Sequence, residues 1–358
     1  MDDGPDHKNK ALTGGLACPL PITRHEQVLL AHGAGGRMSA ELIGSLILPR
    51  FTNPALNRLH DQAILTLPSG RLAFSTDTYV VDPLIFPGGD IGELAINGTV
   101  NDVAMSGARP LFLSLGLVLE EGLPFATLER ILDSMGRAAR EAGVQVVTGD
   151  TKVVPRGKCD KLFINTSGVG VVPEGLELDA SRIRPGDAVI VSGTVGDHGL
   201  AVLTCRERLS FTSQIRSDTA ALYHLVAVML AASSRIRVLR DPTRGGVATS
   251  LNEFAASARL GIVVEEESLP VAPAVRGACE ALGLDPLTVA NEGKLLAVVA
   301  REDAEPLLAA IKGHPLGREA RIIGQVVEEH PGLVALRTGL GVKRLLEMPV
   351  AEQLPRIC

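Results

Sequence analysis

The sequence predicts a two-domain protein of mixed helices and strands, in an α/β or α+β arrangement. Its 358 residues exceed what one small hydrophobic core organises. A hydrophobic fraction of 46% beside a charged fraction of 21% is typical of a packed globular chain. Apolar strand-like runs are interspersed with segments of helical period, which indicates layered sheets and helices. Proline and glycine clusters at 173–175 and 184–187 separate the two halves.

In the first half, apolar side chains at helical spacing predict helices over 37–48 and 127–141. Gly143 is placed to end the second of these helices. Short apolar runs predict strands over residues 63–67, 71–75, 111–119, 144–147 and 162–172.

In the second half, the same patterns predict strands over residues 188–191, 262–265, 295–299 and 322–327. They predict helices over residues 199–206, 219–232 and 247–258. We therefore expect a flexible extension over 1–24, an N-terminal domain over 25–180, a C-terminal domain over 181–345 and a mobile tail over 346–358.

The tail has two prolines and no helical period, so we expect an extended arm. Over about 13 residues it reaches roughly 40 Å at ~3.3 Å per residue. It ends in Cys358. A thiol on such an arm is typical of a tethered nucleophile or acyl carrier. The alternative is a frayed terminus that ends in cysteine without a chemical role, and the tail alone does not decide between them.

Composition excludes several classes of protein. A net charge of −6 lacks the basic face that nucleic-acid binding needs. No apolar run reaches the ~18 residues of a membrane helix. The five cysteines are scattered, without zinc-site spacing, and no secretory signal precedes them. We therefore expect a cytoplasmic protein without nucleic-acid or membrane partners.

Four aspartates each follow a predicted strand or open a predicted turn: Asp61, Asp77, Asp102 and Asp150. Carboxylates at the ends of several strands can converge on one edge of a sheet. Such oxygen ligands suit Mg²⁺ carrying a nucleotide polyphosphate. Each aspartate alone is more typical of a turn or a helix cap. Four of them beside glycine, asparagine or threonine favour the metal-site interpretation.

Two glycine-rich segments precede helices. The first, His32–Arg37, contains Gly33, Gly35 and Gly36, whose backbone N–H groups could bind phosphate. The second, Asp241–Gly246, adds Arg244 as a phosphate partner. Neither a Walker A motif nor a dinucleotide fingerprint occurs, so the first segment alone also fits a flexible lead-in. Glu292, in a polar turn, fits either a solvated charge or a functional carboxylate.

Together these segments resemble the HypE family of hydrogenase maturation factors. That family belongs to the ATP-binding superfamily of aminoimidazole ribonucleotide synthetase, selenophosphate synthetase and thiamine monophosphate kinase. The matching segments are residues 31–37, 75–77, 86–90, 97–102, 147–154, 241–246, 291–293 and 355–358. The resemblance extends from about residue 28 to Cys358. The terminal Pro-Arg-Ile-Cys separates HypE from other members of the superfamily.

The resemblance implies a two-domain ATP-binding fold with mixed sheets, a barrel shared across a homodimer, and an extended C-terminal tail. It implies that ATP drives dehydration of a carbamoyl group on the terminal thiol to a thiocyanate. It implies that the thiocyanate then supplies cyanide for the [NiFe] hydrogenase site. The cofactors are then ATP and Mg²⁺. The partners are a HypF-type carbamoyltransferase and the iron-carrying HypC–HypD complex.

The resemblance also implies roles for individual residues. Cys358 is the carrier thiol, Glu292 the proton acceptor, and Lys152 its helper or phosphate partner. Mg²⁺ is held by Asp61, Asp77, Asp102 and Asp150. ATP is bound by Gly33, Gly35, Gly36, Asn101, Thr151 and Arg244. One departure is Asp61-Gln62, where related proteins often have an acidic pair, so Asp61 fits less well.

Two alternatives remain at this point. One is another ATP-dependent synthetase or kinase of the superfamily. Selenophosphate synthetase needs a reactive cysteine or selenocysteine and a nearby lysine in the first glycine-rich segment, and His32–Arg37 contains neither. The other is a non-catalytic thiol carrier, which would not require the acidic positions.

Overall fold

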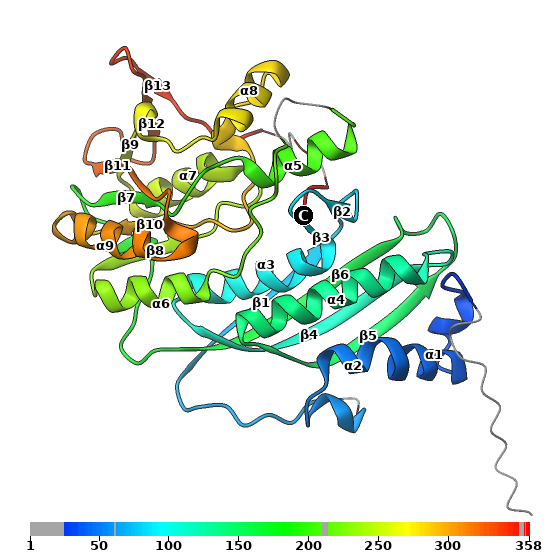
Figure 1. Cartoon of the computed structure of the whole chain (residues 1–358). Coiled ribbons are helices and arrows are strands. Elements are labelled where there is room, and N and C mark those ends of the chain that lie inside the picture. The colour runs from blue at the N-terminus through cyan, green and yellow to red at the C-terminus, as the bar shows by residue number, and fades with distance from the viewer. Residues whose placement is uncertain (1–24, 61, 210–213, 351–353, 355) are drawn as a thin grey trace, which may run out of the picture.

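The computed structural model describes residues 25–60, 62–209, 214–350, 354 and 356–358. One main sheet lies in each half of the chain, and helices pack on the faces of both (Figure 1). Each sheet contains parallel and antiparallel pairs, so the predicted mixed α/β architecture is confirmed. Among the described residues, no helix combines the length and the apolar composition that crossing a membrane requires.

The first half is built on a four-stranded sheet of order β1-β6-β4-β5. Its strands are β1 (Arg71–Tyr79), β4 (Arg109–Glu120), β5 (Gln145–Val154) and β6 (Leu162–Val172). Two long helices, α3 (Ile91–Met105) and α4 (Phe125–Ala142), cover one face of this sheet (Figure 1). The remaining elements are α1 (Arg37–Leu42), a π-helical segment (Ile43–Ile47), α2 (Leu48–Phe51), β2 (Ile85–Phe86) and β3 (Gly89–Asp90).

Helix α4 confirms the predicted amphipathic pattern. Leu128, Ile131, Leu132 and Met135 are fully buried on the face that meets the core. Gly143 ends the helix in the left-handed conformation, with φ 70°, and its N–H bonds the last carbonyls. A residue without a Cβ adopts that conformation at little cost.

Helix α3 was not predicted. Its side chains are buried along most of its length, so it lacks the alternation of apolar and polar faces that reveals a surface helix. Asp90 caps its N-terminus by accepting hydrogen bonds from the N–H groups of Gly92 and Glu93. Its C-terminal residues Ala104 and Met105 lie in a core cluster of the second half. The helix therefore joins the two halves.

The second half is built on a seven-stranded sheet of order β13-β12-β9-β11-β7-β10-β8. Its strands are β7 (Ala188–Val191), β8 (Ile236–Arg240), β9 (Gly261–Glu265), β10 (Leu296–Val299), β11 (Arg321–Val327), β12 (Val334–Arg337) and β13 (Lys343–Leu345). Its helices are α5 (Asp197–Arg206), α6 (Tyr223–Ala232), α7 (Gly246–Ala258), α8 (Pro273–Leu282) and α9 (Arg301–Gly313).

Side chains of β7 alternate between two cores, one on each face of this sheet. Val189 and Val191 pack in the core that includes α7, whereas Ala188 and Ile190 pack in the core of α6 and α9. A strand buried on both faces reads as a continuous apolar run, which is why the sequence pattern revealed it.

Three expectations from the sequence are wrong. Residues 63–67 form no strand, since no strand of the described residues pairs with them, and Ile64 is 76% exposed. Asp102 opens no turn, because it lies within α3. Asp77 and Asp150 lie inside β1 and β5 instead of at strand ends, because both strands are longer than their apolar runs.

Candidate functional site

The candidate site begins where α3 packs against β1. Asp102 on α3 accepts a hydrogen bond from Ser75 Oγ on β1, with 2.7 Å between the oxygens. Asp77 lies two residues after Ser75 and therefore on the same face of the strand. Burial raises the pKa of Asp102, and the nearby charge of Asp77 raises it further, against the hydrogen bond from Ser75. The fold thus brings two predicted metal ligands together.

The second half adds two buried carboxyl groups. Asp241 follows β8 and Glu292 lies in the turn before β10, and the two residues are 7% and 3% exposed. Burial and the charge of Asp102 raise the pKa of Asp241 to about 7. Burial, and then the charges of Asp241 and other nearby aspartates, raise the pKa of Glu292 well above its usual value. We call Asp77, Asp102, Asp241 and Glu292 the interdomain carboxylate cluster.

Glu292 is the least satisfied member of this cluster. Its Oε1 atom is buried and has no hydrogen-bond partner among the described residues. Burial and neighbouring carboxylates both favour the protonated form of such a carboxyl over its charged form. Such perturbed groups are typical of catalytic acids and bases. The alternative of a solvated turn charge is wrong, since the side chain is buried.

Asp218 fixes the turn that carries Glu292. Its carboxylate accepts hydrogen bonds from the backbone N–H groups of Glu292 and Gly293, each at 3.2 Å. Lys294 completes the arrangement with an ion pair of 3.2 Å. A Cβ on Gly293 would lie 1.7 Å from the Asp218 carbonyl oxygen, so only glycine fits there. The glutamate is therefore placed by a rigid backbone.

Asp241→Asn is expected to raise the free energy of unfolding of the nucleotide-free protein at pH 8, and to change it little near pH 4. The folded-state pKa of Asp241 is about 7, above its usual 3.8. Between those values the folded chain binds the extra proton, so wild-type stability falls as the pH rises. Asparagine cannot ionise, and the difference at pH 8 should reach roughly 1–4 kcal/mol.

Denaturant unfolding in the presence of a chelator, at several pH values, measures this difference. Parallel pH profiles for the two proteins would contradict a buried, protonated Asp241.

Asp241 was missed by sequence analysis, which selected Arg244 from the same segment. The missed signal was an aspartate directly after an apolar strand, which is the criterion that identified Asp77 and Asp150. Arg244 itself is exposed, and its charge lowers the pKa of Asp102. Arg244 therefore lies within electrostatic reach of the cluster.

Asn101 joins the two halves and is not placed to bind phosphate. Its Nδ2 donates hydrogen bonds to the carbonyl oxygens of Ala220 and Glu292, at 3.0 and 3.2 Å. Its Oδ1 accepts from the Leu222 N–H at 2.8 Å. The side chain is 1% exposed, and these bonds use both its donor and its acceptor groups.

A second group of predicted residues surrounds a cavity of about 430 Å³ at the β5 edge. Its lining includes Gly33, Gly35, Asp150, Thr151 and Lys152, and we call it the glycine-loop pocket. Gly36, next to the loop, precedes α1 as its N-cap. Backbone N–H groups at such a position favour anions.

Two details show why this pocket has its shape. A Cβ on Gly33 would lie 2.6 Å from the backbone nitrogen of Val153, so the glycine permits the loop to approach β5. Lys152 Nζ lies 2.7 Å from an Asp150 oxygen. The hydrogen bond from Lys152 lowers the pKa of Asp150. Both side chains are mostly exposed, so they are open to a ligand.

The interdomain carboxylate cluster and the glycine-loop pocket are separate within one chain. β1 carries Asp77 and β5 carries Asp150 and Lys152, and the two strands lie at opposite edges of the four-stranded sheet. Three strand spacings separate them, roughly 14 Å. Asp150 therefore does not join Asp77 and Asp102 within one chain, and Lys152 lies at the β5 edge, away from the cluster that contains Glu292. Asp61 falls outside the described residues.

The donors of the cluster nevertheless fit Mg²⁺. The described residues contain no group of three or more histidine, cysteine or carboxylate side chains placed to hold a metal ion. Mg²⁺ in nucleotide sites usually takes only one or two carboxylates, with phosphate oxygens and water completing the octahedron. Asp77 and Asp102 supply such a pair, and burial followed by the charge of Asp77 raises the pKa of Asp102, so a cation between them would be favourable.

The end of the tail lies beside β1. The Val80 N–H donates a hydrogen bond to the Cys358 backbone oxygen, at 3.1 Å. Val80 is three residues after Asp77, which corresponds to roughly 10 Å along an extended chain. Cys358 is half-buried and packs against a core cluster that contains residues of both halves. The structure thus places the terminal thiol near the end of the strand that carries Asp77.

Comparison with known proteins finds matches to both halves of the chain. Residues 59–172 match the family "AIR synthase related protein, N-terminal domain", and residues 184–335 match "AIR synthase related protein, C-terminal domain". The carbamoyl dehydratase HypE of Cupriavidus necator is 55% identical over 345 residues, which is 96% of this chain and 98% of the relative. The chain belongs to the HypE family.

Solved structures of this family match the fold. A HypE crystal structure described as a complex with ATP has a TM-score of 0.89 and 52% identity, and the match covers 92% of this chain and 99% of that one. The HypE chain of a HypE–HypF complex has a TM-score of 0.76 and 46% identity, with coverage of 86% and 99%. The expected resemblance to HypE is confirmed.

Proposed function

We propose that this protein is an ATP-dependent carbamoyl dehydratase that converts a carbamoyl group on Cys358 to a thiocyanate, for the cyanide ligands of [NiFe] hydrogenase. The observation that carries the proposal is the docked terminal thiol beside β1, the strand that contributes Asp77 to the interdomain carboxylate cluster. Membership of the HypE family supports the same activity.

The chemistry requires two kinds of group. An amide oxygen is a poor leaving group, and transfer of the terminal phosphoryl group of ATP to that oxygen turns it into phosphate. Both N–H protons must leave, so that the C–O bond breaks and the C≡N bond forms with release of ADP and phosphate. Glu292 is our candidate for proton acceptor, since it is a buried carboxyl in the cluster.

Glu292 must be ionised before it can accept a proton. The surrounding carboxylates disfavour its ionised form. Mg²⁺ bound to Asp77 and Asp102 would supply positive charge to the cluster and to phosphate. Within this chain, Ser75 orients Asp102, and Asp218 orients the backbone of Glu292. These contacts hold the carboxylates in place before a ligand arrives.

We infer that the protein acts as a homodimer, in which the two separated groups of site residues meet across the interface. On the sheet face opposite α3 and α4, the part of the chain that the structure describes leaves Leu72 and Phe74 of β1 55% and 70% exposed. Apolar exposure of this kind is typical of an interface. A two-fold partner on this face would form the expected shared barrel and bring its β5 edge toward Asp77.

The dimer proposal predicts complementation between inactive variants. Asp77→Asn and Asp150→Asn should each abolish ATP-dependent dehydration while the chain stays folded. If one site takes Asp77 from one chain and Asp150 from its partner, a refolded equal mixture should regain about a quarter of wild-type activity, since random pairing leaves one intact site in half of the dimers. Thiocyanate formation measures this recovery.

The matched control is Asp133→Asn, which removes an exposed carboxylate that pairs with Arg50 and itself lines neither the cluster nor the glycine-loop pocket. It should keep full activity. An inactive mixture of the two site variants would place both aspartates in a site made by a single chain. ATP binding by calorimetry that is normal in both variants would refute their assignment as metal ligands.

The direct test of the function follows the terminal thiol. Protein carbamoylated on Cys358 by a HypF-type carbamoyltransferase should lose the mass of one water on addition of ATP and Mg²⁺. ADP and phosphate should appear in equal amounts. A non-catalytic carrier would keep the carbamoyl group unchanged and consume no ATP. We propose that the HypC–HypD complex receives the cyanide and that the reactions occur in the cytoplasm, in accordance with Cys159, Cys205 and Cys279, which form no disulfide among the described residues.

A further inference from the structure

The last residues of the tail contact both halves of the protein. Leu354 and Ile357 are 6% and 4% exposed and belong to a core cluster that contains residues of both halves. Leu354 packs against Gly199 on α5, where an added Cβ would come within 3.2 Å of it. The Asp82 N–H donates to the Arg356 carbonyl oxygen at 3.2 Å. These contacts define a groove between the two halves that binds the last residues of the tail.

His198 on α5 recognises the tail backbone. Its Nε2 lies 2.6 Å from the Ile357 carbonyl oxygen, and its Nδ1 lies 2.8 Å from Ser217 Oγ. A carbonyl oxygen can only accept, so Nε2 carries the proton and Nδ1 accepts from the serine hydroxyl. The imidazole is fully buried, and its edge meets Phe86 of the first half with 5.5 Å between ring centroids. Its orientation is therefore fixed.

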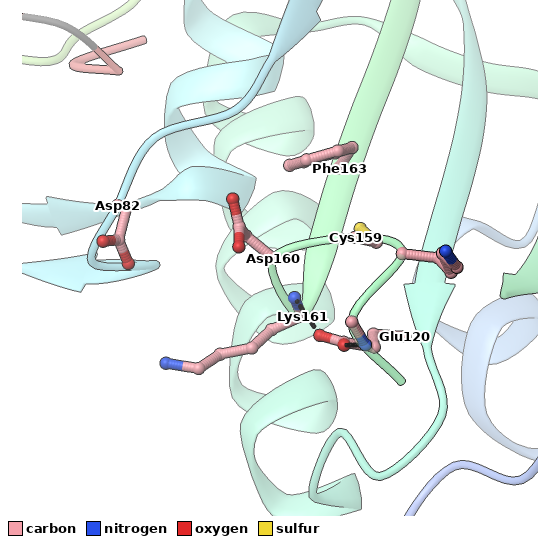
Figure 2. Close-up of a pocket in the computed structure, with 8 residues that line it drawn as sticks. Asp82, Glu120, Cys159, Asp160, Lys161 and Phe163 are labelled. Atoms are coloured by element: carbon pink, nitrogen blue, oxygen red, sulfur yellow. Dashed lines mark hydrogen bonds between the residues drawn. The ribbon is translucent and has the colours of Figure 1, made fainter. Parts of the chain in front are cut away.

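Arg356 holds the tail from the other side. Its Nε donates to the Val80 carbonyl oxygen at 3.1 Å, and its Nη1 pairs with Asp160 at 2.5 Å. Asp160 lies in the loop between β5 and β6 and borders a cavity of about 510 Å³ together with Asp82 (Figure 2). Glu120 fixes this loop by accepting hydrogen bonds from two of its backbone N–H groups, shown as dashed lines in Figure 2.

Two features limit the strength of docking. Arg356 adopts a left-handed conformation with φ 57°, which is unfavourable for a residue with a side chain. Its Nη2 atom is buried without a hydrogen-bond partner among the described residues. Both costs disappear when the tail leaves the groove. These costs weaken the docking of the tail, so the tail can leave the groove and return to it.

We propose that His198 and Asp160 are positioning residues that hold the terminal Arg-Ile-Cys in this groove and so set how often Cys358 is available to an external reactant. The reason given for releasing the tail rests on the proposed function, because a carrier thiol must leave the groove to receive its carbamoyl group. The test of docking needs neither ATP nor a partner protein. Failure of docking is therefore distinguishable from failure of the dehydratase proposal.

The test is the rate at which iodoacetamide alkylates Cys358 in the full chain, followed by peptide mass analysis. His198→Leu removes the donor to Ile357 and should raise the rate about fivefold, the effect expected for loss of one buried hydrogen bond. His198→Gln has nearly the same size and retains a donor, and it should keep close to the wild-type rate. Asp160→Asn should raise the rate about twofold, since its ion pair is partly exposed.

Two internal references make the result specific. Asp133→Asn, which breaks a comparable surface pair, should leave Cys358 alkylation unchanged. Cys205, also partly exposed, lies seven residues after His198 in the same helix and reports general loosening of α5. An equal rise at Cys205 would assign His198 to the folding of α5 and overturn the proposal. An unchanged rate of Cys358 alkylation in both His198→Leu and Asp160→Asn would also overturn the proposal.

Discussion

Cys358→Ala is expected to abolish formation of the carbamoyl and thiocyanate adducts, and with them hydrogenase maturation in a deletion strain. No other described cysteine combines a chain end with partial exposure, because Cys159 and Cys279 are buried and Cys205 lies in a helix. Burial also raises the pKa of Cys159 and of Cys279 to about 11, so their reactive thiolate forms are scarce. Intact-mass analysis after carbamoyl transfer measures the loss.

The fold, the dimer and nucleotide binding should survive this change. The Cys358 backbone keeps its hydrogen bond to Val80, and Ile357 keeps its place in the core. Cys205→Ala is the matched control and should retain full activity. Residues added after Cys358 should also impair function, since a longer chain must be accommodated where the terminus now packs. Maturation that persists in Cys358→Ala would refute the carrier role.

Sequence analysis identified elements whose burial pattern is one-sided or continuous. The helix over 127–141 and the strand over 188–191 were revealed because their side chains meet the core in regular patterns. Helix α3 was not predicted, since burial on most of its sides removes the alternation of apolar and polar residues that indicates a helix. The apolar run at 63–67 was interpreted as a strand because composition says nothing about whether a neighbouring edge is available.

The candidate site was predicted in its residue types but not in its geometry. Asp77 and Asp102 were chosen from local motifs, and tertiary packing of α3 on β1 brings them together. The same motifs selected Asp150, which lies at the far edge of the sheet. Strand order is a long-range property that motif spacing does not contain.

Contacts between segments that are distant in the sequence account for the other differences between the expected and the observed site. Asn101 was grouped with the phosphate ligands, yet its amide is used in bonds to residues more than a hundred positions away. The tail was expected to be a mobile arm, and its mobility stays a prediction. Its end, however, is docked by His198, which no sequence motif singled out. Residues 351–353 and 355 lie outside the described part of the tail.

Glu292→Gln is expected to accept a carbamoyl group on Cys358 at the normal rate and to accumulate it without dehydration. The thiol receives the group, whereas the glutamate removes protons, so the two steps depend on different atoms. Glutamine has nearly the same shape and can keep the backbone bonds to Asp218, but it cannot accept a proton near neutral pH. A positioned general base contributes typically ~10²–10⁴-fold to a rate, so turnover should fall at least about a hundredfold.

The matched control for this change is Glu93→Gln. Glu93 is also a carboxyl whose pKa burial raises, to about 7, but it lies at the start of α3, away from Asp102. Its replacement removes a similar group and should leave the dehydration rate within about twofold of wild type, as expected for a residue outside the site. Mass analysis with ATP separates the two variants, since only Glu292→Gln should retain the carbamoyl mass. Ordinary loss of water in Glu292→Gln would exclude Glu292 as the base and leave Asp241, its buried neighbour in the cluster, as the carboxyl to test next.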